Sequence, residues 1–267
     1  YSGCKVASTT MIKHRETRMK RRQMITGLAA LAGTTGLGRV LAQDTQSAIG
    51  AGACRLTRQD VTGPFYVDFY PDRSNLMESE KGVPLTLDFV VRDVMSCKPV
   101  PGARVIIWSA NAEGFYSGAV NPVLAADGTL AGDKADFREA TFLRGQQTTD
   151  ASGRVRFVTA YPGWYFPRAT HLHVKVLPPD FGEEHTTQLY FPNAINDVVY
   201  ASEHYVHRGP NPTRKQPGDS SPIFSYGDES LWLNLKKTNE GFEAAHELGV
   251  VFYGDMFGPL TDHYRHG

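Results

Sequence analysis

The segment Tyr161–Val176 constrains the fold of this 267-residue chain more than any other stretch. A turn rich in Pro, Gly and aromatic residues is followed there by His171-Leu172-His173-Val174-Lys175-Val176, in which polar and apolar side chains alternate. Because the side chains of a β-strand point alternately to opposite faces, the pattern predicts a strand with one apolar core face and one face that carries two imidazoles. Two such histidines can bind one metal ion, and the turn before them supplies a phenol, Tyr165, and a guanidinium, Arg168.

Short apolar runs separated by turns make up most of the remaining sequence. Strands are predicted at 85–91, 104–108, 155–159 and 186–191, and in the C-terminal runs 231–235 and 248–253. Neither an internal repeat nor a long amphipathic helix is evident. We therefore expect an all-β fold, an antiparallel β-sandwich with long irregular loops and little helix. If the strand at 186–191 forms a hairpin with the histidine strand, Gln188 lies beside the histidines.

Residues 1–42 are predicted to be a leader, because they hold 8 Lys/Arg and only 1 Asp/Glu. Arg21-Arg22 precedes a mildly apolar run and the small-residue sequence Val40-Leu41-Ala42, a pattern typical of a twin-arginine signal. We expect export to the periplasm or the extracellular space, and no stable membrane anchor, since the apolar run is too short to span a bilayer. A basic tail without export function is the alternative. Residues 43–53 are then a linker, and 54–267 form the β-sandwich domain.

Charge and cysteine content limit the possible partners and compartments. After residue 42 the chain has 20 Lys/Arg and 27 Asp/Glu, and this negative balance argues against nucleic acid as a partner. Cys4 lies in the leader, so Cys54 and Cys97 could form a disulfide in an exported protein. Two buried free thiols are equally compatible with the sequence.

Four side chains are of types that bind metals, namely Tyr116, Tyr165, His171 and His173. Phenolate oxygen is a hard anionic donor and imidazole suits iron, copper or zinc, so this set favours ferric iron. A zinc site more usually includes Cys or a carboxylate, and the ferrous facial triad requires a carboxylate that this segment lacks. Taken singly, each of the four residues could equally be an ordinary structural or surface residue.

Several motifs, in order along about residues 54–195, make the chain resemble the intradiol ring-cleavage dioxygenases, and most of all their single-domain exported branch. These enzymes are non-haem ferric proteins that open catechols between the two hydroxyl-bearing carbons. The motifs are Leu56-Thr57, Gly63-Pro64-Phe65-Tyr66, Pro99-Val100-Pro101-Gly102-Ala103, Ile107-Trp108, Gly114-Phe115-Tyr116-Ser117-Gly118, Phe142-Leu143-Arg144-Gly145 with Thr149-Asp150, Tyr161-Pro162-Gly163-Trp164-Tyr165 with Arg168 and His171-Leu172-His173, and Gln188-Leu189-Tyr190-Phe191.

The resemblance implies that Tyr116, Tyr165, His171 and His173 bind Fe³⁺, that Arg168 is the catalytic arginine, and that Gln188 is the pocket glutamine. It further implies that the diol binds the iron as a dianion, that Tyr165 leaves the iron and accepts a proton, and that Arg168 stabilises charge that develops during O₂ attack and acyl migration. Gln188 would orient the intermediate, and the product would be a cis,cis-muconate type diacid.

The expected partners are therefore a small aromatic diol, derived from lignin or other aromatics, and O₂. Which catechol is used is left open, and a carboxylated substrate would require a second cationic side chain facing the pocket. Ser109-Ala110 stands where the family usually has His-Cys, and a helical dimerisation domain is not evident, so monomer and homodimer are both open. The alternative function is a non-catalytic β-sandwich module that binds polyphenol or carbohydrate on Trp108, Trp164 and Trp232.

Overall fold

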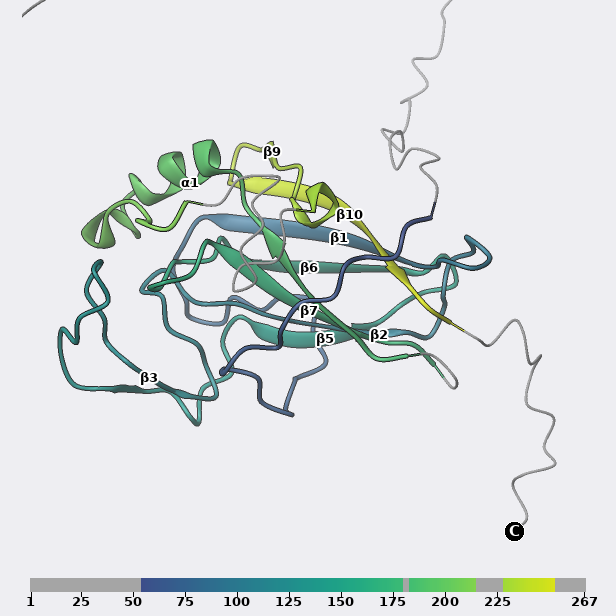
Figure 1. Ribbon diagram of the computed structural model, residues 1–267, viewed down its shortest axis with the longest axis horizontal. Helices are drawn as coiled ribbons and strands as arrows, with labels where there is room; N and C mark the ends of the chain where they lie inside the picture. The colour runs from purple at the N-terminus through teal and green to yellow at the C-terminus, as the bar shows by residue number, and fades with distance from the viewer. Residues whose placement is uncertain (1–53, 180–182, 215–227, 253–267) are drawn as a thin grey trace, which may run out of the picture. The chain divides into compact units, whose positions relative to one another are not determined.

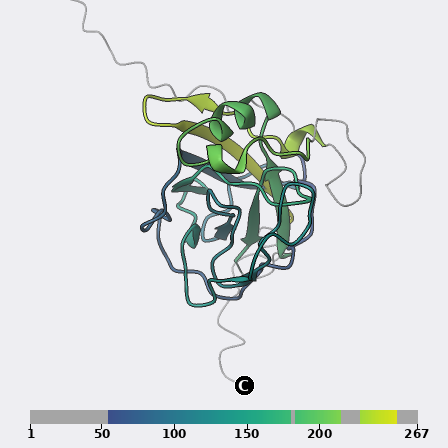
Figure 2. The same cartoon turned by 90° about the vertical axis from the view of Figure 1, so that its left-hand side faces the viewer.

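The computed structural model describes residues 54–179, 183–214 and 228–252. The predicted leader and linker lie outside the described residues. Two four-stranded sheets, ordered β6-β1-β10-β9 and β5-β2-β7-β8, pack face to face (Figures 1 and 2). The elements are β1 (Pro84–Asp93), β2 (Arg104–Trp108), β3 (Val120–Asn121), β4 (Ala135–Asp136), β5 (Arg144–Thr148), β6 (Arg154–Ala160), β7 (His171–Leu177), β8 (His185–Tyr190), α1 (Asn193–Tyr200), β9 (Lys236–Lys237) and β10 (Phe242–Val250), with 3₁₀ turns at Val206–Arg208 and Glu229–Leu231.

The main core lies between the two sheets and is built from alternate residues of each strand. Leu172, Val174 and Val176 of β7 face this core, as the sequence pattern predicts. They pack with the apolar face of β1, which includes Leu87 and Phe89. Burial of these side chains is the main stabilising contribution to the sandwich, at about 1.5–3 kcal/mol for each large one. The opposite face of β7 is left for His171, His173 and Lys175.

The all-β prediction is confirmed, with two differences in detail. β1 and β10 pair in parallel, although every other pair of strands in the two large sheets is antiparallel. No hairpin constrains these two strands, because about 150 residues separate them in the sequence. The predicted strand at 231–235 is wrong: a 3₁₀ turn ends at Leu231, and only Trp232 bridges to Tyr190. The little helix expected is also seen: in the described part of the chain one α-helix, α1, follows β8, and no described helix has the length and apolar character needed to cross a bilayer.

The outer face of the β5-β2-β7-β8 sheet is covered by an N-terminal arm, defined here as residues 54–70. A second, smaller apolar cluster forms there, with Ile106 and Trp108 of β2, Tyr70 of the arm, and Tyr116. Backbone hydrogen bonds attach the arm to both sheets, from Thr57 N to Gly249 O and from Asp60 N to Thr186 O, each 2.9 Å. This covered face contains the candidate site.

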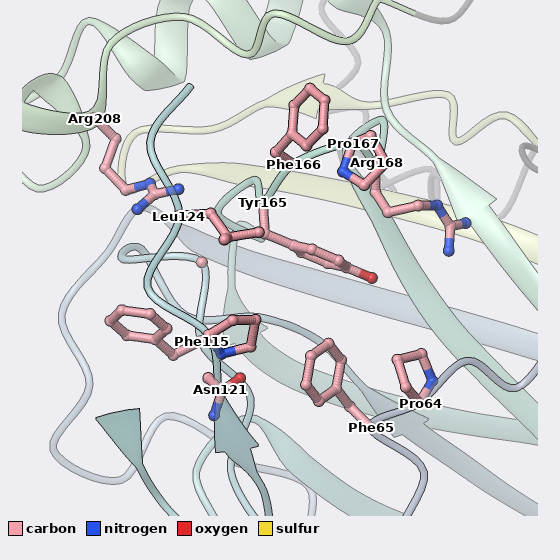
Figure 3. A pocket seen from close by; sticks show the side chains of 12 residues that line it. Pro64, Phe65, Phe115, Asn121, Leu124, Tyr165, Phe166, Pro167, Arg168 and Arg208 are labelled. Carbon is pink, nitrogen blue, oxygen red and sulfur yellow. The ribbon is translucent and has the colours of Figure 1, made fainter. Parts of the chain in front are cut away.

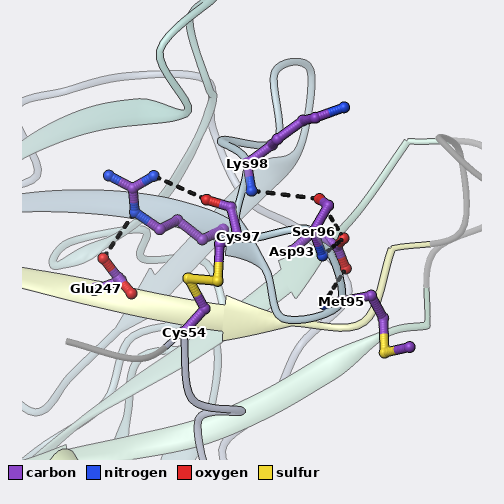
Figure 4. Close-up of a disulfide and its surroundings, with 8 residues drawn as sticks. Cys54, Asp93, Met95, Ser96, Cys97, Lys98 and Glu247 are labelled. Carbon is purple, nitrogen blue, oxygen red and sulfur yellow. Dashed lines mark hydrogen bonds and ion pairs between the residues drawn. A yellow bond between two sulfur atoms is a disulfide. The ribbon is translucent and has the colours of Figure 1, made fainter. Parts of the chain in front are cut away.

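A disulfide fastens the start of the arm to the turn between β1 and β2 (Figure 4). Cys54 and Cys97 are bonded, with their Cα atoms 5.4 Å apart, so the disulfide alternative is confirmed and the free-thiol alternative is wrong. The turn is held by Asp93, whose carboxylate accepts a hydrogen bond from the backbone N–H of Ser96 at 2.8 Å. Beside it, Arg92 pairs with Glu247 of β10 at 2.8 Å. The arm therefore begins from a point that is fixed to the sandwich.

Candidate metal centre

Donor atoms of four predicted site residues converge on the outer face of the sheet. Nε2 of His171 lies 3.3 Å from the hydroxyl of Tyr116, 3.4 Å from the hydroxyl of Tyr165 and 3.1 Å from Nε2 of His173. Tyr116 and the two histidines are buried, whereas Tyr165 is only partly buried. The structure thus brings together all four side chains that the sequence suggested as metal ligands.

Tyr116 is positioned by its own loop and by two polar side chains. The amide of Asn121 brackets the Tyr116 backbone, accepting a hydrogen bond from its N–H at 2.8 Å and donating one to its carbonyl at 2.9 Å. The buried guanidinium of Arg144 donates to the carbonyls of Ser117 and Phe65 at 2.8 and 2.9 Å. Arg144 therefore joins the Tyr116 loop to the N-terminal arm.

The Tyr161–Arg168 turn and the Tyr116 loop meet backbone to backbone. Gly114 has φ +83°, and a Cβ at this position would lie 2.3 Å from the carbonyl oxygen of Trp164, so no other residue fits without a shift of the backbone. Within the turn, Arg168 N–H donates to Tyr165 O at 2.8 Å. This close approach sets the spacing between the two phenols, whose rings contact edge to face with centroids 5.6 Å apart.

The register of β7 and β8 puts Gln188 opposite His173 and Tyr190 opposite His171, as expected for the hairpin. The Gln188 amide oxygen accepts hydrogen bonds from the Arg168 guanidinium and, at 3.3 Å, from the Tyr190 hydroxyl. Its amide nitrogen donates to Val61 O at 2.7 Å. In this structure Gln188 thus positions Arg168 and the arm.

The imidazole of His171 has an assigned tautomer, because its Nδ1 lies 2.6 Å from Ala169 O, which can only accept. Nδ1 therefore carries the proton, and the lone pair of Nε2 points at the cluster, the arrangement usual for a metal-binding histidine. His173 is fixed differently: its ring stacks on Trp108 with centroids 4.7 Å apart and planes 5° apart. Nδ1 of His173 is buried without a hydrogen-bond partner in the described part of the chain.

Burial determines the protonation states of the cluster. It raises the pKa of Tyr116 well above its ordinary value, with a further contribution from Tyr165, and it also raises the pKa of Tyr165 against the opposing charge of Arg168. Burial, reinforced by Arg168, lowers the pKa of His171 to about 3 and that of His173 well below its usual range. The imidazoles are neutral at pH 7, and the phenols need a cation nearby in order to ionise.

The arrangement of these four groups is explained better by coordination of a metal ion than by hydrogen bonds among the groups themselves. One Nε2 lone pair cannot accept hydrogen bonds from three neighbours at once, yet three donor atoms surround Nε2 of His171 at 3.1–3.4 Å. Atoms about 2.0–2.1 Å from a common centre at tetrahedral angles lie about 3.3 Å apart, which is the spacing seen. Among the described residues no three His, Cys, Asp or Glu side chains gather in this way, so a site here depends on the phenols. Hard phenolate donors suit a hard, highly charged cation such as Fe³⁺.

A cavity of about 280 Å³ adjoins the cluster, and Tyr165 belongs to both (Figure 3). Arg168 lines it at the end where the Tyr165 hydroxyl lies, and Arg208 lies across it, beyond Leu124. Tyr116 and the two histidines do not line the cavity. Its lining residues are Pro64, Phe65, Gly114, Phe115, Asn121, Pro122, Leu124, Tyr165, Phe166, Pro167, Arg168 and Arg208.

Sequence reasoning missed Asn121 and Arg208, which lie in segments without a recognisable pattern, and it gave no role to Arg144, although this residue belongs to one of the quoted motifs. The alternative that the protein is a binding module loses two of its three proposed stacking side chains, because Trp108 is 0% and Trp164 3% exposed. Trp232 is half-buried and packs against the main core. The buried indoles of Trp108 and Trp164 therefore cannot stack on a ligand.

The fold and this buried Tyr/Tyr/His/His cluster define the class of protein. Residues 61–209, more than half of the chain, match the family described as Dioxygenase. The chain belongs to the intradiol ring-cleavage dioxygenases, a family in which non-haem iron is typical.

Individual relatives agree with this assignment. The chain is 38% identical over 171 residues to a protocatechuate 3,4-dioxygenase beta chain of Burkholderia cepacia, covering 61% of this chain and 62% of that one. It is 30% identical over 175 residues to a catechol 1,2-dioxygenase of Candida albicans, covering 54% and 51%. The match thus spans about half to three fifths of these relatives. An intradiol ring-cleavage dioxygenase from Tetranychus urticae has the same fold, with a TM-score of 0.60 at 24% identity over 74% of this chain and 95% of that chain.

Proposed function

We propose that this protein is a non-haem ferric dioxygenase that cleaves a catechol-type aromatic diol between its hydroxyl-bearing carbons with O₂, giving a cis,cis-muconate type diacid. The observation that carries the proposal is that the hydroxyl oxygens of Tyr116 and Tyr165 and Nε2 of His173 all lie within 3.1–3.4 Å of Nε2 of His171. The adjoining apolar cavity, which is large enough for a substituted benzene ring, supports it further.

Tyr116, Tyr165, His171 and His173 would hold the ferric ion. When bound, Fe³⁺ would supply Lewis acidity that lowers the pKa of the diol hydroxyls, and it would make the aromatic ring reactive toward O₂. The chain's own contribution is a fixed donor set. His171 presents Nε2 because Ala169 O holds its Nδ1 proton, and Trp108 fixes the ring plane of His173.

Tyr165 is the member of the donor set that can take part in proton transfer. It lines the cavity and is only partly buried, whereas Tyr116 is fully enclosed. Because burial raises its pKa, the Tyr165 phenolate is a good proton acceptor whenever it is not compensated by a cation. It is therefore suited to accept a proton from an incoming diol hydroxyl.

Arg168 supplies a positive charge at the same end of the cavity. Its side chain is 8% exposed and is held by Gln188, so its guanidinium is oriented before a substrate arrives. A fixed cation in a water-poor site stabilises negative charge that develops on substrate oxygens during the reaction. Gln188 acts through Arg168 as a positioning residue.

The test is to purify the mature protein, load it with ferric iron, and measure iron content, visible absorption and O₂ uptake with a panel of catechols. We expect one iron per chain, a phenolate-to-iron charge-transfer band, and diacid formation. A colourless protein that takes up no ferric iron would falsify the proposal. Tight binding of a polyphenol without O₂ uptake would instead favour the binding module.

We also propose that the protein is exported through a twin-arginine signal. The pattern that carries this, Arg21-Arg22, lies outside the described residues, and support comes from the Cys54–Cys97 disulfide, since stable disulfides are typical of oxidising compartments. Changing Arg21-Arg22 to Lys-Lys should leave the precursor in the cytoplasm. Unchanged secretion of that variant would remove the twin-arginine assignment.

A further inference from the structure

Arg208 is a second cation in the wall of the cavity, and no role follows for it from the donor set described above. It ends the 3₁₀ turn that follows α1, and Figure 3 shows its side chain reaching toward the cavity from the side opposite Arg168. The guanidinium carbon lies 4.5 Å from the centroid of the Trp164 ring, and Nη2 donates to Trp164 O at 3.2 Å. Its buried Nε has no hydrogen-bond partner in the described part of the chain.

The cavity wall contains two arginines and no acidic side chain. Its other side chains are apolar, apart from Asn121 and Tyr165. Glu113 is the acidic group whose charge acts on Arg208, but its carboxylate pairs with His207 at 2.7 Å and does not line the cavity. Arg208 is half-buried and no acidic side chain lines the cavity beside it, so a ligand that reaches this end of the cavity should carry a negative charge there.

Tyr165 provides a measure of the length of that ligand. Its hydroxyl lies in the donor cluster, and the peptide carbonyl just before it, that of Trp164, binds Arg208. A tyrosine side chain is itself a para-substituted phenol, so its Oη-to-Cα span matches the span from the phenolic oxygen to a carboxylate oxygen in 4-hydroxybenzoate. A ring beside Tyr165, with its hydroxyls at the cluster, would bring a para carboxylate to the level of Arg208.

From this geometry we propose that Arg208 binds a carboxylate on the substrate ring, opposite the diol, so that the substrate is of the 3,4-dihydroxybenzoate type. The proposal rests on the function proposed above and makes Arg208 the residue that selects between charged and neutral diols. Guanidinium is suited to this task because its planar fork of donors matches a carboxylate, and its position over Trp164 fixes the plane of that fork.

The test compares Arg208→Met with Arg208→Lys in the iron-loaded protein. Met covers Trp164 but has no charge, whereas Lys keeps the charge, so the pair separates packing from recognition. The control is Arg214→Gln, which removes a charge from the same segment, where Arg214 pairs with Asp197 and does not line the cavity. The values of kcat/KM for 3,4-dihydroxybenzoate and 4-methylcatechol are measured by O₂ uptake. Calorimetric binding of 4-hydroxybenzoate and phenol, which lack the second hydroxyl, is measured alongside.

We expect the wild type to prefer 3,4-dihydroxybenzoate and Arg208→Met to lower the ratio of the two kcat/KM values by about 10- to 100-fold, the usual effect of losing a hydrogen bond to a charged group. The preference of 4-hydroxybenzoate over phenol in binding should fall in parallel. Arg208→Lys should retain an intermediate ratio, and Arg214→Gln should stay within about 2-fold of wild type, as befits an exposed ion pair.

The inference is overturned if the wild type prefers the neutral diol, or if Arg208→Met leaves both ratios unchanged. It is also overturned if Met and Lys lower them equally, because packing alone would then explain the effect. Its failure is distinct from failure of the proposed function. Cleavage of 4-methylcatechol without any preference for the charged diol would refute only the role of Arg208. A protein that binds no iron and cleaves neither diol would refute both the role of Arg208 and the proposed function.

Discussion

Gly63 touches the metal centre from the arm, and its replacement by alanine tests how tightly the arm holds His173. Gly63 has φ +73°, and a Cβ added there would lie 3.2 Å from Cε1 and 3.7 Å from Nε2 of His173. The arm cannot easily move away, because Val61 O accepts from Gln188 at 2.7 Å on one side and Phe65 O accepts from Arg144 at 2.9 Å on the other. The new methyl group must therefore displace the imidazole or strain the arm.

Two costs add up in Gly63→Ala. A left-handed backbone conformation costs an alanine about 1–2 kcal/mol. Extra volume against a ring that is already stacked on Trp108 costs about 1–3 kcal/mol more. We expect the free energy of unfolding of the metal-free protein to fall by about 2–5 kcal/mol. The affinity for ferric iron should fall about 10- to 100-fold, as is typical when the support of a metal ligand is disturbed.

The control is Gly102→Ala in the turn before β2. Gly102 has φ +78°, and the nearest atom to an added Cβ, Cγ of Pro179, is 3.8 Å away, an ordinary contact. This variant bears the backbone cost alone, so we expect a loss of about 1–2 kcal/mol and unchanged iron affinity. Denaturant unfolding and iron titration followed by visible absorption measure both quantities. Equal losses of stability in the two variants, with equal iron affinity, would refute the claim that the arm presses on His173.

Three further predictions concern the donors, the pH dependence and the disulfide. Tyr116→Phe and Tyr165→Phe should each lower iron content and weaken the charge-transfer band, with Tyr116→Phe the more severe because that phenol is fully enclosed; wild-type absorption in both would contradict the ligand set. Burial lowers the pKa of His246 to about 4, so the unfolded chain binds the proton more readily between pH 4 and 6.5 and the contribution of this residue to stability is lost as pH falls through that window. His246→Gln should therefore flatten the decline of unfolding free energy by up to about 1.4 kcal/mol per pH unit there, and an unchanged slope would count against it. Cys97→Ser opens a crosslink with a sequence separation of 43 and should lower the unfolding free energy by up to about 4 kcal/mol, measured with and without reductant; no difference from oxidised wild type would show that the bond contributes nothing.

Local sequence determined the faces of the strand that carries the site. Alternation along Leu172–Val176 assigns apolar side chains to the core and the histidines to the opposite face, because a one-residue shift would expose the whole apolar set. A short connection joins this strand to the next, which made the position of Gln188 beside His173 predictable as well. The order of motifs along the chain was sufficient to suggest Tyr116 as a partner of these residues, although the sequence alone contained no distance between them.

Only the tertiary structure determined the contacts between segments that lie far apart in the chain. The parallel pairing of β1 with β10, the arm lying over His173, and Arg144 between the arm and the Tyr116 loop all depend on contacts between distant segments. The same holds for Arg208, which packing brings to the cavity from a turn with no sequence pattern. Period-two alternation is a property of neighbouring residues and can be seen in the sequence, whereas the meeting of remote side chains is fixed only when two sheets and their covering loops pack together around a shared core.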